Sequence, residues 1–286
     1  MNESAGSRLR KLLKEKDPLQ VVGVINACCA LLAQQAGFKA LYLSGAGVAN
    51  AAWGLPDLGI TSLADVTEEV RRITGCVNLP LLVDGDTGWG SGLNIQHTIH
   101  EFIRAGAAGV HLEDQFWPKR CGHRSGKRLI SSQEMVDRLK AAVDARSDPN
   151  FIIIARTDAL GIEDLGAVIQ RAVEYEKAGA DMIFVEAVTD LEHYRQFAKA
   201  VQVPVLANIT EFGQTPLFSV SDLKSVGVKL ILYPLSAFRA MNKAALNVYQ
   251  TIRTKGSQST VIDTMQTREE LYQLLDYYKY EQQLDS

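Results

Sequence analysis

The sequence predicts an α/β protein, a (β/α)8 barrel of the TIM type, from two repeated features. Eight short apolar runs rich in Val, Ile and Leu recur along the chain, and each is followed by a helical pattern. Runs that are apolar throughout, rather than alternating, are typical of parallel strands covered on both faces. Eight strand–helix units in 286 residues fit this barrel, whereas the glycine-rich motif of an open dinucleotide-binding sheet is missing after the first run.

The apolar runs set the positions of the helices between them. Ser131 with Glu134, and Thr189 with Glu192, have the spacing of capping boxes and indicate helix starts. Ala-Gly-Ala sequences at 105–107 and 178–180 indicate helix ends just before a strand. The predicted strands are Val21–Ile25, Ala40–Ser44, Leu81–Asp84, Gly109–Glu113, Phe151–Arg156, Met182–Glu186, Val203–Asn208 and Lys229–Tyr233.

Composition and charge exclude several classes of function. With 47% hydrophobic residues and a net charge of −3, the chain has no field that would attract nucleic acid or an anionic membrane. No apolar run approaches the roughly 18 residues of a membrane-spanning helix, and the basic N-terminus lacks a secretory signal pattern. Four cysteines without zinc-like spacing favour a reducing compartment, so we expect a cytoplasmic protein in which Cys28, Cys29 and Cys76 are buried, inert thiols.

We expect one barrel domain over residues 1–286, because no low-complexity linker divides the chain. Residues 267–285 have the pattern of one additional C-terminal helix. Leu271, Leu274, Leu275 and Tyr278 recur in it at helical spacing and need a surface to pack on. That surface is either the helix's own barrel or a neighbouring subunit.

The carboxyl ends of the predicted strands are unusually rich in acids, arginines and amides. A barrel of this type carries its active site at that end, and unrelated surface loops would seldom bring so many such groups together. The polar residues at or just beyond the strand ends are Tyr42, Ser44, Asp84, Asp86, His111, Glu113, Arg156, Asp158, Glu186, Asn208, Thr210 and Arg239.

Two carboxylates one residue apart, Asp84 and Asp86, close the third predicted strand, with Gly85 between them and Gly88 two residues after Asp86. Magnesium suits such a pair because it accepts one or two protein carboxylates and keeps waters that reach other acids. Asp57 and Glu113 are candidates for those outer acids. The alternative is that Asp84 and Asp86 only shape a turn or cap the next helix.

Arg156 and Arg239 can each hold a carboxylate through a bidentate guanidinium. Asn208 and Thr210 add neutral hydrogen-bonding groups beyond the seventh strand. A metal site with two arginines suits a small polycarboxylate ligand. The alternative for Arg156 is a structural ion pair with Asp158 or Glu186.

A lone cysteine lies among cations about ten residues after the fourth predicted strand. Lys119, Arg120 and His123 surround Cys121 and Gly122. Positive neighbours stabilise a thiolate, so we expect the pKa of Cys121 to be lowered from its usual value of roughly 8.5. The alternative is a surface loop whose cysteine has no chemical role.

These stretches resemble the isocitrate lyase and phosphoenolpyruvate mutase superfamily over essentially the full length. The Lys-Arg-Cys-Gly-His sequence is the most specific of them: isocitrate lyases carry Lys-Lys-Cys-Gly-His in a much longer chain, and phosphonate mutases lack the cysteine. The resemblance is therefore to the branch that cleaves 2-methylisocitrate. The matching stretches are Ser44–Gly45, Val83–Gly88, Gly109–Gln115, Lys119–His123, Ala155–Ala159, Ala207–Gly213, Tyr233–Arg239 and Met265–Arg268.

The resemblance implies a retro-aldol-type cleavage of a tricarboxylate to pyruvate and succinate. Such a reaction needs a base for the hydroxyl proton, a cation at the α-hydroxy-acid end and an acid for the carbanion on the succinate half. Magnesium at Asp84 and Asp86 would be the cation, with manganese as the alternative ion. Cys121 is the expected acid.

The base is less clearly marked than the acid. Tyr42 is the first candidate, with its phenol pKa lowered by the metal and arginines, and His111 is the second. Residues 115–128, rich in glycine, serine and cations, have the composition of a lid that closes over the substrate.

The resemblance also implies a set of substrate contacts. Phe184, Leu232 and Pro234 stand where isocitrate lyases tend to carry Trp, Phe and Thr, which leaves apolar space for an extra methyl group. Ala46 departs from the glycine that is usual in the family's substrate-binding turn. The implied contacts are Ser44, Gly45, Ala46, Cys121, Gly122, His123, Arg156, Phe184, Glu186, Asn208, Ile209, Thr210, Leu232, Pro234, Arg239 and Arg268.

The resemblance further implies a homotetramer that exchanges C-terminal helices. Two other functions compete with this one: a related activity, such as isocitrate cleavage, oxaloacetate hydrolysis or phosphonate chemistry, and a catalytically silent barrel that serves as a binding or assembly protein. Oxaloacetate hydrolysis and phosphonate chemistry need no thiol to protonate a carbanion, and a silent barrel would not retain the acids, arginine and cysteine together.

Overall fold

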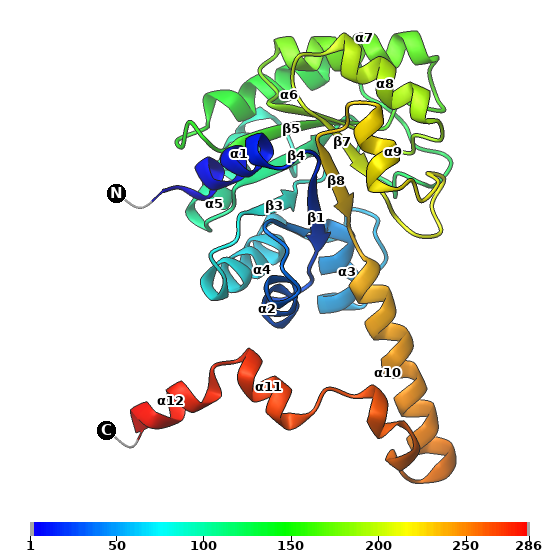
Figure 1. Ribbon diagram of the computed structural model, residues 1–286. Helices are drawn as coiled ribbons and strands as arrows, with labels where there is room; N and C mark the ends of the chain where they lie inside the picture. Colours follow the sequence, from blue (N-terminus) through cyan, green and yellow to red (C-terminus); the bar gives the residue numbers. More distant parts are fainter. Residues whose placement is uncertain (1–2, 285–286) are drawn as a thin grey trace.

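The computed structural model describes residues 3–284 and contains the predicted closed barrel. The parallel strands pair in chain order, and β8 closes onto β1 (Figure 1). The strands are β1 Leu19–Gly23, β2 Leu41–Leu43, β3 Leu81–Asp84, β4 Gly109–Glu113, β5 Ile152–Thr157, β6 Met182–Val185, β7 Val205–Asn208 and β8 Leu230–Tyr233. All eight predicted strands are therefore confirmed, and the first lies two residues earlier than expected.

Helices follow the strands and surround the barrel (Figure 1). None within residues 3–284 is long and apolar enough to cross a membrane. The helices are α1 Ala5–Glu15, α2 Ala27–Gln35, α3 Gly45–Trp53, α4 Leu63–Cys76, α5 Gly92–Arg104, α6 Ser132–Asp144, α7 Leu165–Lys177, α8 Leu191–Ala200, α9 Val220–Ser225, α10 Ser236–Lys255, a 3-10 helix Ser259–Thr264, α11 Arg268–Leu274 and α12 Tyr277–Leu284.

The helix boundaries confirm most of the expected signals. Ser131 caps α6 by accepting a hydrogen bond from the backbone N–H of Glu134. The prediction for α8 is wrong by one residue, because Asp190 rather than Thr189 accepts the capping bond. Gly106 and Gly179 end α5 and α7 with φ of 87° and 103°, a backbone conformation that glycine adopts without strain.

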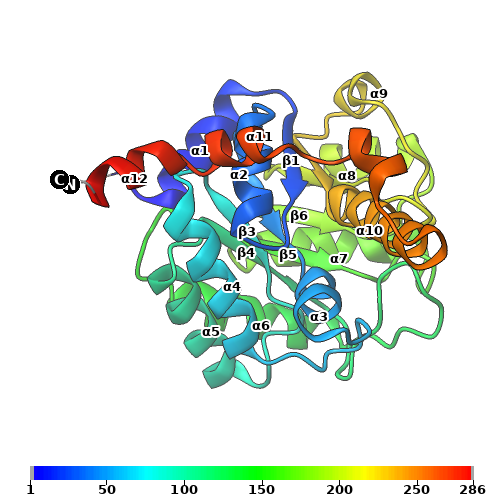
Figure 2. The ribbon, with the colours of Figure 1, turned by 90° about the horizontal axis from the view of Figure 1, so that it is seen from below.

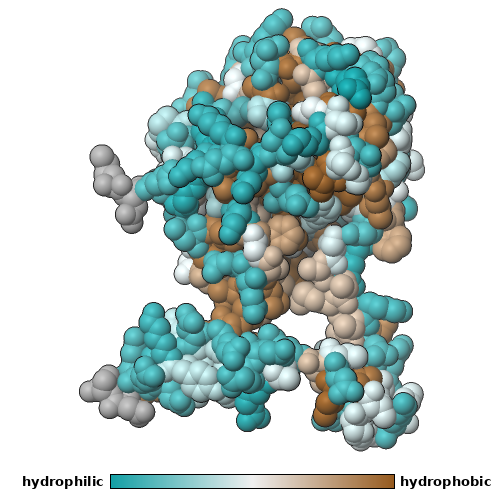
Figure 3. Space-filling model, viewed as in Figure 1, coloured by the Kyte–Doolittle hydropathy of each residue, from teal (hydrophilic) through white to brown (hydrophobic). Residues whose placement is uncertain are grey.

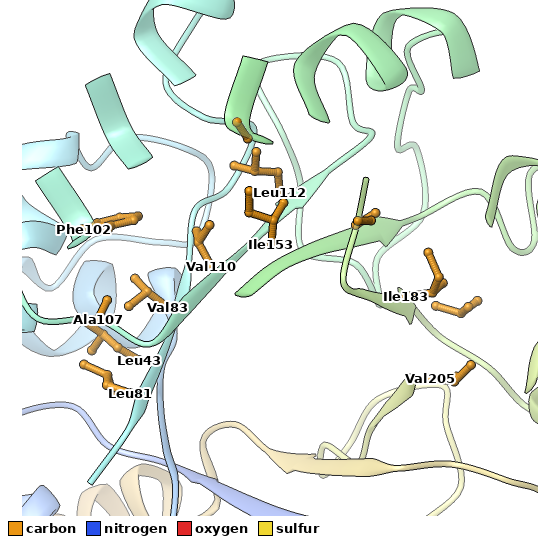
Figure 4. Close-up of a cluster of buried hydrophobic side chains, with 14 of the residues drawn as sticks. Leu43, Leu81, Val83, Phe102, Ala107, Val110, Leu112, Ile153, Ile183 and Val205 are labelled. Atoms are coloured by element: carbon orange, nitrogen blue, oxygen red, sulfur yellow. The ribbon is translucent and has the colours of Figure 1, made fainter. Parts of the chain in front are cut away.

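Alternating side chains of each strand separate the core into two layers. An inner cluster that includes Tyr42, Leu82, Ile154 and Phe184 fills the barrel, and Leu9 of α1 packs against it. The outer cluster lies between the strands and the helices. Figure 4 shows part of this outer layer, with side chains from strands β2 to β7 and Phe102 of α5. The filled interior leaves the carboxyl ends of the strands as the place for a site.

The C-terminal segment differs from the predicted single helix. Two short helices, α11 and α12, replace it, because Asp276 between them has a left-handed backbone with φ of 52°; Asp285 of the predicted helix lies outside the described residues. α10 extends away from the barrel, and α11 and α12 run back beneath it (Figures 1 and 2).

Two of the cysteines expected to be buried are exposed. Cys29 is buried against the core, but Cys28 and Cys76 lie at the surface. Adjacent residues on a helix point about 100° apart, so Cys28 cannot share the buried face of α2 with Cys29.

Candidate active site

A cavity of about 290 Å³ opens at the carboxyl ends of the strands. It is lined by most of the residues predicted to form the site, and these come from the strand ends, from the loops that follow them, and from the first turns of α3 and α10. The predicted residues that line it are Tyr42, Ser44, Ala46, Asp57, Asp84, Cys121, Gly122, His123, Arg156, Phe184, Glu186, Asn208, Thr210, Leu232, Pro234 and Arg239.

Some predicted site residues lie outside the lining. Asp86, His111 and Glu113 are buried close behind it. Ile209 packs its side chain into the outer core. Arg268 begins α11, beyond the 20-residue helix α10, and does not line this cavity.

Asp84 and Asp86 lie side by side at the end of β3. The backbone N–H of Asp86 donates to Asp84 Oδ1 at 3.1 Å, and the N–H of Gly45 donates to Asp84 Oδ2 at 3.0 Å. A Cβ at residue 45 would come within 3.3 Å of both carboxylates, so glycine there lets the start of α3 approach the two acids. Asp84 thus lines the cavity and also accepts a hydrogen bond from the first residue of α3, so the contacts of the alternative reading, a turn and a helix start, are present in the same pair.

The two carboxylates differ in their tendency to ionise. Burial opposes ionisation of Asp84, but His111, Lys119 and Arg156 outweigh it and hold the Asp84 pKa at about 2. Burial raises the pKa of Asp86 to about 6, against the opposing effect of Lys119. Asp84 is therefore the more readily ionised member of the pair.

Lys119 contributes a cation to this acid cluster. Its side chain is 4% exposed and contacts Asp57, and its Nζ lies 2.8 Å from Asp86 Oδ1. Burial opposes the charge of Lys119, but Asp86, Glu113 and Asp57 outweigh burial and raise the Lys119 pKa well above its usual value. Lys119 therefore does not face Cys121 as a free cation.

Glu113 is the most weakly satisfied acid of the cluster. It is fully buried, and neither carboxylate oxygen makes a hydrogen bond, although Arg156 Nη1 lies 3.3 Å from Oε2. Burial raises the Glu113 pKa well above its usual value. Such buried, unpaired oxygens fit the role of acceptors for waters on a nearby cation.

The acids at this site fit magnesium, which keeps part of its water shell, better than an ion that takes all its ligands from the protein. Among residues 3–284, no three or more His, Cys, Asp or Glu side chains form a group that could hold a metal directly. Two adjacent carboxylates and an unsatisfied third acid are what a partly hydrated magnesium ion requires.

Tyr42 and His111 form a pair beside Asp84. The Tyr42 hydroxyl lies 2.9 Å from His111 Nε2 and 3.4 Å from Asp84 Oδ2. Burial lowers the His111 pKa to about 4, so the imidazole is neutral at pH 7. Burial, followed by the charge of Asp84, raises the Tyr42 pKa well above its usual value, which is opposite to the expected direction.

Arg156 is the centre of the ionic network. It donates to Asp158 at 2.9 and 3.1 Å, and its guanidinium lies 3.2 Å from Glu186 and 3.3 Å from Glu113. The structural ion pairs considered from sequence are thus present, while Arg156 also lines the cavity. Both properties hold for the same side chain.

Cys121 lies in the predicted lid, and its environment reverses one expectation. Burial raises the Cys121 pKa, whereas the sequence predicted a lowered value. The flanking cations are directed elsewhere: Lys119 contacts Asp57, Arg120 Nη1 reaches the Ser125 carbonyl, and His123 Nε2 lies 3.2 Å from Glu186. The thiol therefore keeps its proton near neutral pH, as a proton donor must.

Sequence reasoning missed several lining residues: Lys119, Arg124, Glu211, Phe212, Gly213 and Leu235. All of them except Arg124 lie in stretches that match the family, and Arg124 directly follows one of these stretches, so the sequence did carry a signal for them. Within residues 3–284 the guanidinium of Arg124 makes no ion pair or hydrogen bond with another residue. Long-range packing brings Glu211, Phe212 and Gly213 to the cavity, since the 209–219 loop meets the lid where Gln214 bonds His123.

Comparison with known proteins agrees with this geometry. A family model described as phosphoenolpyruvate phosphomutase matches residues 9–253. The chain is 59% identical to the 2-methylisocitrate lyase of Escherichia coli (strain K12), over 99% of this chain and 96% of that protein.

Two solved structures, each 32% identical, share the fold. The first, 2,3-dimethylmalate lyase, is described as a PEP mutase/isocitrate lyase superfamily member and has a TM-score of 0.91, covering 98% of this chain and 95% of its own. The second, oxaloacetate acetylhydrolase with 3,3-difluorooxalacetate, has a TM-score of 0.92, covering 99% and 98%.

The chain therefore belongs to the PEP mutase/isocitrate lyase superfamily. Its identity to the Escherichia coli protein over nearly the full length then assigns it to the 2-methylisocitrate lyases, which are carbon–carbon lyases. The resemblance predicted from the motifs is confirmed at both levels.

Proposed function

We propose that the protein cleaves 2-methylisocitrate to pyruvate and succinate with magnesium bound at Asp84 and Asp86. The observation that carries this proposal is that Asp84, Arg156 and the protonated thiol of Cys121 border one cavity, with Asp86 buried directly behind Asp84. A retro-aldol cleavage requires this arrangement, in which a cation site is available to one end of a small molecule and an acid is available to the other end. The racemic substrate with magnesium should yield pyruvate.

The cationic side chains account for binding of a tricarboxylate. Arg156 and Arg239 were expected to bind carboxylates, and Arg124 adds a third guanidinium to the lining, one that pairs with no other residue among 3–284. Arg239 Nε lies 3.8 Å from Glu211, which leaves it available for a shorter contact. Asn208 and Thr210 would orient the same groups through neutral hydrogen bonds.

Magnesium at Asp84 and Asp86 would polarise the α-hydroxy-acid end, with Asp57 and Glu113 reached through water; manganese is the alternative ion. Tyr42 lines the cavity with His111 behind it, so the tyrosine is positioned to take the hydroxyl proton. The neutral imidazole at 2.9 Å can accept the phenol proton in turn.

Bond cleavage leaves an electron pair on the succinate half. Cys121 lines the same cavity with its thiol protonated and is positioned to deliver the proton that completes succinate. His123, held by Glu186 and Gln214, keeps the adjoining lid residues over the cavity. The lid would exclude water from the carbanion.

An apolar corner of the cavity favours the methylated substrate. Phe184 and Leu232 are each about 1% exposed and line the cavity with Pro234. One methyl group in such a pocket is worth about 10–200-fold in kcat/KM, so isocitrate should be the poorer substrate by that factor.

The pocket assignment is tested with Leu232→Phe, which narrows the corner, and Leu232→Met, which conserves volume. We expect Leu232→Phe to lower kcat/KM for 2-methylisocitrate more than for isocitrate, and Leu232→Met to preserve the preference. An unmodified enzyme with equal or greater kcat/KM for isocitrate would belong to the isocitrate branch instead.

Hydrolysis of oxaloacetate is the second candidate, because the fold is shared with oxaloacetate acetylhydrolase. That hydrolysis would leave the electron pair of the broken bond on an acetate fragment instead of a succinate fragment, so the products distinguish the two reactions. The four free cysteines suit a reducing compartment, and we propose the cytoplasm.

We propose a homotetramer in which C-terminal segments are exchanged between subunits. None of the 20 residues of α10 is buried, and its apolar side chains Met241, Leu246 and Tyr249 are exposed. An apolar cavity of about 350 Å³ lies between α2 and the start of α10. Hydrophobic side chains also gather on the barrel face above α11 and α12 (Figure 3). A monomer at micromolar concentration in light scattering would contradict the tetramer.

Exchange would also give Arg268 a role in the site. Arg268 does not line the cavity of its own chain, so we propose that it reaches the cavity of a neighbouring subunit. Arg268→Met and Cys121→Ser should each be nearly inactive alone, while co-expression should restore activity in mixed oligomers. Each restored site would combine an intact Cys121 with an intact Arg268 from the other chain. Inactive mixtures would contradict the exchange.

A further inference from the structure

Lys127 is a buried lysine in the lid that the mechanism above does not use. Its side chain is 6% exposed. Its ammonium donates to the Gly122 carbonyl at 2.7 Å and to Asp158 Oδ1 at 3.2 Å. The first contact lies within the lid, next to Cys121, and the second ties the lid to the end of β5.

Gly122 is the lid residue whose backbone lies against the Arg156–Glu186 ion pair, beside the side-chain contacts of His123 and Lys127 with the same network. A Cβ on Gly122 would overlap the side chains of Glu186 and Arg156. The Gly122 backbone therefore lies directly on this ion pair, and its carbonyl faces Lys127. Any retreat of the lid from the network moves Gly122, and with it Cys121.

Asp158, which follows the end of β5, connects Lys127 to the same ionic network. It is fully buried and accepts two hydrogen bonds from Arg156, at 2.9 and 3.1 Å. The backbone N–H of Asp158 is held in turn by Asp114 at 2.8 Å. Asp158 is thus a fixed anchor, and it shares the Arg156 guanidinium with Glu186.

We propose that Lys127 is a positioning residue that holds Gly122 against the Arg156–Glu186 pair and so sets the place of the Cys121 thiol. The inference rests on the proposed function only in taking Cys121 as the acid. Charge balance can explain the contact of Lys127 with Asp158, because Asp158 shares Arg156 with Glu186. It does not explain the hydrogen bond from Lys127 to the neutral Gly122 carbonyl, and that bond carries the proposal.

The test compares Lys127→Met, which removes the ammonium, with Lys127→Arg, which keeps a charged donor. Arg128→Met is the matched control, since it removes the neighbouring exposed cation. Alkylation of the substrate-free enzyme by iodoacetamide is followed at Cys121 by peptide mass spectrometry, with exposed Cys28 and Cys76 as reference thiols. The alkylation rates are measured across pH. The limiting rate at high pH, where the thiol is fully ionised, reports access to Cys121, and the midpoint of the rise with pH reports the thiol pKa.

Lys127→Met should raise the limiting rate at Cys121 about tenfold, the change expected when a hydrogen bond from a charged donor is lost. It should lower kcat by a similar factor with a smaller change in KM, because the acid acts only in the chemical step. Lys127→Arg should lie between Lys127→Met and the unmodified enzyme.

The proposal is overturned if Lys127→Met matches Arg128→Met in both the Cys121 limiting rate and kcat. The labelling result does not depend on Cys121 being the acid. If Cys121→Ser kept full kcat, the proposed function would lose its acid, while the labelling rates would still decide the role of Lys127.

Discussion

Asp84→Ala and Asp86→Ala should each lower kcat by about three orders of magnitude, because a Lewis acid contributes several kcal/mol to such a cleavage. An excess of chelator should abolish activity in the unmodified enzyme, and added magnesium should restore it. The physical reason is that these two carboxylates are the paired, buried donors at the cavity, and Glu113 alone cannot hold the ion.

A direct readout of metal binding accompanies this prediction. Magnesium should raise the melting temperature of the unmodified protein but not of Asp84→Ala or Asp86→Ala, since a ligand stabilises only a protein that binds it. Asp137→Ala, which removes an exposed acid of α6, is the control and should behave as the unmodified protein does. Full activity in chelator would contradict the metal assignment.

Cys121→Ser should lower kcat by about 10²–10⁴-fold while leaving KM and the fold nearly unchanged. A hydroxyl is close in size to a thiol but is a far weaker acid, so the loss belongs to protonation of the carbanion. Cys28→Ser, which changes an exposed thiol outside the cavity, should keep full activity. Wild-type kcat in Cys121→Ser would show that another group donates the proton.

The raised Cys121 pKa gives this prediction a pH dependence. An acid catalyst works while it is protonated, so kcat should hold at neutral pH and fall as the pH rises through the Cys121 pKa. Cys121→Ser should lack that alkaline decline, because a serine hydroxyl does not ionise in the accessible range. A decline that persists in Cys121→Ser would belong to another group.

The barrel and most of the cavity followed from local patterns in the sequence. Continuous apolar runs mark strands buried on both faces, and the carboxyl ends of such strands meet at one end of a barrel. Asp84, Arg156 and Asn208 could therefore be placed together without knowledge of any contact between them. The position of each residue along its own strand was sufficient.

Ion pairing between distant segments could not be read from the sequence. Lys119 was expected to act on Cys121, two residues away, but it contacts Asp57, which lies 62 residues earlier in the chain. The direction of the Cys121 pKa was wrong for this reason. Burial, which depends on how the lid packs, proved larger than the effect of cations nearby in sequence.

The C-terminal segment shows a second limit. Its apolar spacing is compatible with one helix, yet Asp276 adopts a left-handed backbone that divides the segment in two. Asp is among the few residues that tolerate this conformation, so the sequence permitted the break without requiring it.

The most direct test of the account is a proton NMR measurement of the products formed from racemic 2-methylisocitrate and magnesium in D₂O. The account predicts pyruvate and succinate in equal amounts, with one solvent deuteron in each succinate, because the carbanion takes its proton from an exchangeable thiol. Parallel samples with chelator, or with oxaloacetate in place of 2-methylisocitrate, should give no products. Absence of pyruvate, or pyruvate without matching succinate, would contradict the assignment as a 2-methylisocitrate lyase.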